Sequence, residues 1–310
     1  MSSEMSFVRR VRSVLSIAYI RKNPWVLLRA LVVVALLVVL VTQRTFWTPD
    51  VLLIILLVLG LVFGKTKQFA IRFGPFLGLL VVYDSMRSWA DKINPYVNYV
   101  PMIDFDRWLF AGNLPTTWLQ SLWWHGHVQW YDFYFYGLYM VHFLVPVVVA
   151  LLLWRYREKL YWPFVSSMVI LSFMAFFTYV AFPAAPPWMA VRDGYVQEPF
   201  TRISSEVWSA MGVKNFSQVY GQLAPNEVAA VPSLHSAYPL VVAVFTLLAF
   251  GWRRAWWIVI YPLSMWVGVV YLGEHYVFDI VIGAAYAFAA CAGVLWLFKR
   301  KRKRASKAAL

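Results

Sequence analysis

Two histidines and one aspartate stand at spacings that suit nucleophilic and acid–base chemistry. His275 and Asp279 are four residues apart, so they share one face of a helix if a helix begins near them. A carboxylate bonded to one ring nitrogen fixes the tautomer and makes the other nitrogen a better nucleophile or base. His235 lies 40 residues earlier, in the sequence Pro-Ser-Leu-His. Each pattern alone is also typical of an ordinary interfacial histidine, and it is their conjunction that indicates a site.

The composition sets the class of protein that must position these residues. Of 310 residues, 62% are hydrophobic and 14% are charged, whereas soluble domains carry roughly 25% charged residues. Aromatic residues make up 19% and include 17 tryptophans, which suits the aromatic belts at membrane interfaces. The composition excludes a soluble globular domain and a disordered chain. It predicts an all-α, polytopic membrane helix bundle.

Eight apolar runs are candidates for membrane spans, each of which needs about 20 residues. They are residues 25–43, 49–64, 68–84, 131–153, 161–183, 235–250, 255–272 and 277–298. We expect the first two spans, residues 25–64, to be an addition to a core of six helices. One membrane catalytic domain, residues 25–298, then follows a basic N-terminus at 1–24 and precedes a basic tail at 299–310.

The basic residues predict the orientation of these spans. Eight spans place both termini on one side, and 21 of the 28 lysines and arginines then fall on that side. The positive-inside rule makes it the cytoplasmic side. The net charge of +14 is therefore explained by cytoplasmic loops and by a basic tail that attracts anionic lipid. No nucleic-acid-binding motif accompanies the charge.

The same topology places both histidines of interest at the extracytoplasmic face. His235 opens the sixth span and His275 precedes the eighth, so they can share one site. Two long outer loops, 85–130 and 184–234, border that site, and long loops are often functional. The first loop contains a run of apolar and aromatic residues at 118–124, which predicts a segment lying in the membrane interface.

Metal-ligand spacing is weak in this sequence. His125 and His127 form one candidate pair, but no carboxylate or cysteine stands near them at ligand spacing, which favours a structural role. The single cysteine, Cys291, lies in an apolar run and forms no internal disulfide. We therefore expect neither a metal nor another cofactor. No feature of the sequence indicates an oligomeric state.

Four motifs resemble those of a known family. The strings Pro232–His235 and His275–Asp279 resemble the second and third motifs of the type 2 phosphatidic acid phosphatase superfamily. Phe182–Trp188, which reads Phe-Pro-Ala-Ala-Pro-Pro-Trp, and the segment Phe105–Pro115 are similar to strings of its aureobasidin-sensitive inositol phosphorylceramide synthase branch. The resemblance covers roughly residues 84–283.

The resemblance implies a role for each motif residue. His275 would attack phosphorus and form a phosphohistidine, with Asp279 orienting its ring. His235 would protonate the leaving oxygen as general acid and later act as the base that activates the acceptor. Ser233 would donate a hydrogen bond to a phosphate oxygen. This chemistry requires no metal.

The chain departs from the phosphatases of the superfamily in its cations. Where those enzymes carry Ser-Arg before the nucleophile, this chain has Gly268 and Val269, and their Lys-x6-Arg-Pro motif is absent. A phosphate monoester dianion needs more neutralisation than a diester monoanion, so the loss favours a diester substrate. Arg87 and Arg192 are the outer-face candidates for compensating cations, although solvated loop charges are the alternative reading of both.

Three functions therefore stand as hypotheses. The first is a lipid phosphotransferase that moves a phospho-headgroup, such as phosphoinositol, from a membrane phospholipid to a lipid acceptor. The second is a lipid phosphate phosphatase, in which water takes the phosphoryl group from phosphatidic acid or a polyprenyl phosphate. The third is a transporter or non-catalytic scaffold, against which the absence of repeated halves argues. The missing cations favour the first.

Overall fold

The structure is a computed structural model that describes residues 31, 34, 66–212 and 226–308. Nearly all of the two predicted N-terminal spans lies outside the described residues. The chain divides into two units, Met1–Gly78 and Leu79–Leu310. Helix α5 (Thr66–Arg87) contains the predicted span 68–84 and runs across this boundary.

The described residues form helices, turns and isolated bridges, without a β-strand, as predicted from the composition. Two helices, α11 (Glu158–Ala181) and α18 (Val277–Ala308), are long and apolar enough to cross a membrane. Helices α9 (Trp130–Met140) and α10 (Leu144–Tyr156) pass the same criterion as a pair, bent by 59°. Two or three candidate spans are thus found among the described residues, and the full number of eight stays a prediction.

Two further predicted spans correspond to shorter helices. The prediction 235–250 is α15 (Leu234–Phe250), an apolar helix of 17 residues. The prediction 255–272 is divided into α16 (Trp252–Ala255), the 3-10 turn η1 (Trp256–Val259) and α17 (Ile260–Tyr271). Helices α15 and α17 consist almost entirely of apolar residues, as expected of buried or membrane-embedded segments.

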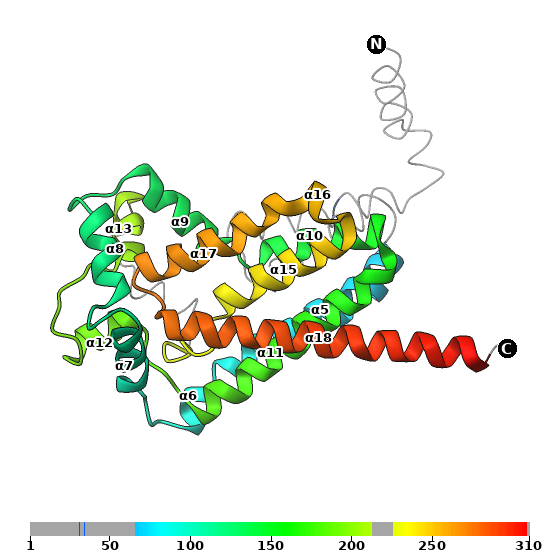
Figure 1. Cartoon of the computed structure of the whole chain (residues 1–310), viewed down its shortest axis with the longest axis horizontal. Helices are drawn as coiled ribbons and strands as arrows, with labels where there is room; N and C mark the ends of the chain where they lie inside the picture. The colour runs from blue at the N-terminus through cyan, green and yellow to red at the C-terminus, as the bar shows by residue number, and fades with distance from the viewer. Residues whose placement is uncertain (1–30, 32–33, 35–65, 213–225, 309–310) are drawn as a thin grey trace, which may run out of the picture. The chain divides into compact units, whose positions relative to one another are not determined.

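Helix α15 is central to the packing of this unit. It lies against α10, α11, α17 and α18, while α18 also packs along α11 (Figure 1). Polar side chains connect neighbouring helices within the apolar core: the hydroxyls of Ser172 and Tyr238 are 2.7 Å apart, and those of Thr178 and Tyr286 are 3.0 Å apart. Such hydrogen bonds satisfy hydroxyl groups that lie between packed helices.

Short helices gather at the end of the bundle where α18 begins, and the basic end of α18 lies at the opposite end (Figure 1). They are α6 (Ala90–Ile93), α7 (Val100–Leu109), α8 (Pro115–Trp123), α12 (Pro187–Arg192) and α13 (Ile203–Ala210). On α8, Trp118 and Leu122 are at least half exposed, whereas Thr116 and Gln120 are buried. A helix with its apolar side chains facing outward is the pattern expected at a membrane interface.

The Pro-rich segment 182–188 runs through the centre of this helical end. Ala184 forms isolated parallel bridges with Asn98 on one side and Ala229 on the other. Ala184 and Ala185 are fully buried, and small side chains allow this close approach of three backbones. The segment therefore supports the chain that leads into Pro232 and His235.

Candidate active site

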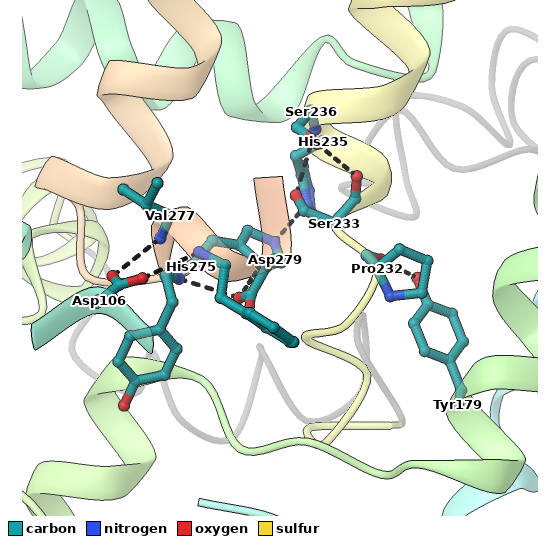
Figure 2. A network of polar contacts seen from close by, with 11 residues as sticks. Asp106, Tyr179, Pro232, Ser233, His235, Ser236, His275, Val277 and Asp279 are labelled. Carbon is teal, nitrogen blue, oxygen red and sulfur yellow. Dashed lines mark hydrogen bonds and ion pairs between the residues drawn. The ribbon is translucent and has the colours of Figure 1, made fainter. Parts of the chain in front are cut away.

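His235, His275 and Asp279 meet in one chain of contacts (Figure 2). His275 Nδ1 lies 3.0 Å from Asp279 Oδ2, and His275 Nε2 lies 3.2 Å from His235 Nδ1. Asp279 is fully buried, and only 6% of His275 is exposed. The structure thus brings together the three residues that the sequence nominates for catalysis.

The contacts assign the proton positions on His275. Because the Asp279 carboxylate accepts, Nδ1 of His275 carries the hydrogen and Nε2 carries the lone pair. That lone pair faces His235 Nδ1, which is the donor of the 3.2 Å contact. One nucleophilic nitrogen and one N–H group therefore face the same small volume, as a transfer with leaving-group protonation requires.

The start of α18 explains why His275 and Asp279 meet. Asp279 Oδ2 also accepts the backbone N–H of Tyr276 at 3.0 Å, one of the N–H groups that a helix leaves without an internal partner. The carboxylate stabilises this turn and holds the imidazole at once. Asp279 Oδ1 has no hydrogen-bond partner among the described residues.

Ser233 fixes the start of α15 and with it the position of His235. Its hydroxyl oxygen accepts the backbone N–H of Ser236 at 3.2 Å, so Ser233 is the N-cap at which α15 begins. Its own N–H donates to the backbone carbonyl of Asp279 at 3.1 Å, so the first turns of α15 and α18 are directly joined. The hydroxyl hydrogen of Ser233 is not used by the cap, and its bond to a phosphate oxygen stays a prediction.

Close packing and one tyrosine keep these two turns together. Tyr179 on α11 donates its hydroxyl hydrogen to the Pro232 carbonyl at 2.9 Å (Figure 2). Gly283 on α18 faces the first turn of α15, where a Cβ atom would lie 2.5 Å from both Ser233 O and Ser236 Oγ. Only glycine permits this approach.

Sequence similarity to known proteins identifies the family of this chain. A family model described as the PAP2 superfamily matches residues 101–293, well over half of the chain. The chain belongs to the PAP2 superfamily. No solved structure matches it.

Two curated relatives carry names from the branch that the motifs resemble, which confirms the predicted resemblance. A phosphoinositol dihydroceramide synthase of Bacteroides thetaiotaomicron is 28% identical over 87% of this chain and 90% of its own length. The inositol phosphorylceramide synthase catalytic subunit AUR1 of Saccharomyces cerevisiae is 22% identical over 82% of this chain and 63% of its own length. Apolar helices and these relatives together indicate an integral membrane protein.

The positions that carry Ser-Arg in phosphatases of the PAP2 superfamily are closed here. A Cβ atom on Gly268 would lie 2.8 Å from the Phe135 ring. Val269 is fully buried, and its carbonyl accepts the backbone N–H groups of Glu274 and His275 at 3.0 and 3.1 Å. A larger side chain at either position would therefore displace buried neighbours.

The two arginines nominated as compensating cations lie in different surroundings. Arg87 is mostly buried, pairs with Asp84 at 3.3 Å, and is close enough to His142 and His235 for its charge to act on both. Arg192 is 54% exposed and pairs with Asp193 at 2.7 Å, which lowers the pKa of that carboxyl. A phosphate-binding role stays a prediction for both.

His142 is a third histidine at the site that the motif analysis missed. Its ring centroid lies 4.0 Å from that of His235, and Tyr139 stacks on His235 at 4.1 Å. Nδ1 of His142 donates to the Tyr139 carbonyl at 2.7 Å, so Nε2 is the remaining polar atom of its ring. An ionisable residue inside the predicted span 131–153 was the available signal.

A buried ion pair beside the nucleophile was also missed. Both oxygens of Glu274 accept from Arg202, at 2.9 and 3.1 Å, and Glu274 is 3% exposed. The Arg202 guanidinium also lies 3.9 Å from the centroid of the Trp188 ring. This pair holds the residue just before His275 against the outer loop 184–234.

No group of three metal-ligating side chains occurs in the part of the chain that the structure describes. His127 Nδ1 contacts the His125 carbonyl at 3.2 Å, and its Nε2 contacts Gln129 at 2.7 Å. These contacts are confined to the exposed loop between α8 and α9.

Proposed function

We propose that this chain is a lipid phosphotransferase that moves a phosphate-linked headgroup from a membrane phospholipid to a lipid alcohol. The observation that carries the proposal is the His235–His275–Asp279 chain of contacts, which pairs a nucleophile with an acid. Both relatives are named as synthases of inositol-phosphate sphingolipids. Phosphoinositol and a ceramide are therefore the first donor headgroup and acceptor to test.

In the first step, His275 Nε2 would attack the phosphorus of the phospholipid. A nitrogen–phosphorus bond forms, and the bond from phosphorus to the glycerol oxygen breaks. The imidazolium form of His235 gives that oxygen a proton and becomes neutral. The product would be a phosphohistidine that still carries the esterified headgroup, together with diacylglycerol. Asp279 would stabilise the positive charge that develops on the ring of His275.

In the second step, His235 would take the proton of the acceptor hydroxyl. The resulting oxygen attacks phosphorus, the nitrogen–phosphorus bond breaks, and His275 returns to its starting state. The closed positions at Gly268 and Val269 favour a diester at this stage, because a headgroup ester leaves one negative charge on phosphorus instead of two.

The proposal includes the topology of eight spans, with residues 25–298 as the catalytic domain and both termini cytoplasmic. The catalytic turn and the basic tail, which begins at Lys299, stand at opposite ends of α18 (Figure 1). The intervening helix, residues 277–298, has a length of about 33 Å at the usual rise per residue. The hydrocarbon core is about 30 Å thick, so a tail at the anionic cytoplasmic surface puts the site at the outer face.

The test uses purified protein with phosphatidylinositol labelled in its headgroup and a ceramide acceptor. We expect labelled inositol phosphorylceramide from the unmodified protein. His275→Ala should remove all product, His235→Ala should lower turnover by about 10²–10⁴-fold, and Asp279→Asn should be the mildest of the three. His125→Ala, a change at an exposed histidine outside the site, should leave turnover unchanged.

Two results would reject the proposal. Turnover close to that of the unmodified protein in His275→Ala or His235→Ala, with the protein still folded, would reject the assigned roles. Release of free phosphate from phosphatidic acid or a polyprenyl phosphate, without headgroup transfer from any diester, would make the chain a phosphatase.

A further inference from the structure

Asp106 makes an unusual contact with the catalytic helix. It lies on α7, in the outer loop 85–130, and is 1% exposed. Its Oδ2 accepts the backbone N–H of Val277 at 3.0 Å, and its Oδ1 accepts that of Phe278 at 3.0 Å (Figure 2). These are the first two residues of α18, 171 and 172 residues further along the chain.

Together, two carboxylates bind three successive N–H groups at the start of α18. Asp279 takes that of Tyr276, and Asp106 takes the next two. These groups have no partner within the helix and carry its partial positive charge, so they favour anions. His275 is the residue immediately before this bonded turn, and its position depends on where the turn begins.

Holding α7 against α18 does not require a carboxylate. Met102 and Ile103 of α7 are buried in one apolar cluster with Tyr276, which already joins these parts. Burying a charge is costly unless it is paired or hydrogen-bonded, and the Asp106 charge also repels that of Asp279. A carboxylate buried at this cost, with both oxygens on the first turn of α18, is expected to serve the geometry of the site.

We propose that Asp106 is a positioning residue for phosphoryl transfer: its carboxylate fixes the first turn of α18 and thereby holds His275 at His235. The inference rests on the proposed function. It also gives a role to the segment Phe105–Pro115, which the resemblance singles out without assigning one.

The surroundings of Asp106 make this role dependent on pH. Burial raises the pKa of Asp106 to about 7, against the two backbone bonds that lower it. The other ionisable groups near it are Asp279, Tyr276 and Arg107, and Arg107 is paired with Glu198 at 2.7 Å. As pH falls through about 7, Asp106 gains a proton, loses its charge and binds the two N–H groups more weakly.

The experiment compares Asp106→Asn with Asp104→Asn in the headgroup-transfer assay. Asp104 is on the same helix two residues away, but it is exposed. We expect Asp106→Asn to lower kcat by about 10- to 100-fold with little change in KM, since an error of about 1 Å in the reacting geometry costs up to about 10²-fold. Asp104→Asn should behave as the unmodified protein.

The pH dependence separates positioning from a merely structural role. The ratio of kcat between the unmodified protein and Asp106→Asn should increase as pH rises through about 7, because only the former ionises there. Titration of the histidines affects both proteins and cancels in the ratio. Asp106→Ser, which keeps an acceptor oxygen without a charge, repeats the test if Asp106→Asn does not fold.

Failure of this inference is distinguishable from failure of the proposed function. If His275→Ala is inactive but folded Asp106→Asn or Asp106→Ser matches the unmodified protein, the positioning role is wrong and the function stands. A folded variant with lower kcat but a ratio that does not change with pH also overturns the role. If His275→Ala keeps its activity, the function itself is wrong.

Discussion

Gly283→Ala offers the sharpest test of the geometry of the site, because the added methyl group should separate α18 from the first turn of α15. The Cβ atom of an alanine there would lie 2.5 Å from Ser233 O and Ser236 Oγ, which flank His235 in the first turn of α15. Ordinary contact begins at 3.4 Å, so the two helices must separate by about 0.9 Å at this point. The nearer neighbours are a backbone carbonyl and a buried hydroxyl, neither of which can rotate away cheaply.

The size of the effect follows from this separation. If the first turn of α15 moves away by the whole amount, the 3.2 Å contact between His235 Nδ1 and His275 Nε2 opens to about 4.1 Å and ceases to be a hydrogen bond. A misplacement of about 1 Å can cost about 10²-fold in rate. Overpacking costs about 1–3 kcal/mol of stability, and the better helix propensity of alanine returns about 0.5–1 kcal/mol. We therefore expect a protein that folds but turns over about 10²-fold more slowly.

The assay is headgroup transfer in parallel with thermal unfolding in detergent, and Gly293→Ala is the control. Gly293 lies on the same helix, but its Cβ atom would meet nothing within 4 Å. Gly293→Ala should therefore keep full turnover and unfold at an equal or higher temperature. If Gly283→Ala turns over as fast as Gly293→Ala, the close approach of α15 and α18 does not set the catalytic geometry, and the reasoning is refuted.

Two other predictions concern the outer loop and the topology. Glu274→Gln should lower the free energy of unfolding by about 3 kcal/mol or more, because it removes the negative charge that faces the Arg202 guanidinium. Thermal unfolding measures the change, and Glu206→Gln, at an exposed position, should have little effect. Equal unfolding temperatures of the two variants would contradict a stabilising role of the Arg202–Glu274 pair. In intact cells, Ser209→Cys in the outer loop should react with an impermeant maleimide, whereas Ser306→Cys in the basic tail should react only after the membrane is opened. The native Cys291 is buried and should add little background labelling. The reverse pattern of labelling would mean that the topology is inverted.

The grouping of His235, His275 and Asp279 was predictable because its signals are local in sequence. The four-residue spacing of His275 and Asp279 translates directly into one helical turn, and Ser233 two residues before His235 is a recognisable N-cap. The long helices were predictable for the same reason: hydrophobic runs locate both ends of α11 and the start of α18 to within a few residues, whereas α18 continues through the basic tail to Ala308. The bend between α9 and α10 lies inside one apolar run, which hydropathy alone does not resolve.

The residues that support the site were not predictable, since each depends on a partner far along the chain. Asp106 binds N–H groups about 170 residues away, and the Arg202–Glu274 pair joins residues 72 apart. Neither carboxylate stands at a spacing that distinguishes it from a solvated loop charge. His142 was visible only as an ionisable residue within a span, and its relation to His235 emerges from the packing of α15 against α10.

The positions that carry Ser-Arg in the phosphatases are filled by apolar packing in this chain. In the sequence, Gly268 and Val269 look like simple losses, which an arginine restored at position 269 would repair. In the structure, Val269 is packed in an apolar cluster with Met265, Val270 and Ile280. An arginine there would bury its charge in this cluster, which is costly unless the charge is paired and hydrogen-bonded. The apolar cluster that contains Val269 is thus part of the packing between α17 and α18, and we predict that Val269→Arg disturbs this packing instead of adding a phosphate-binding cation.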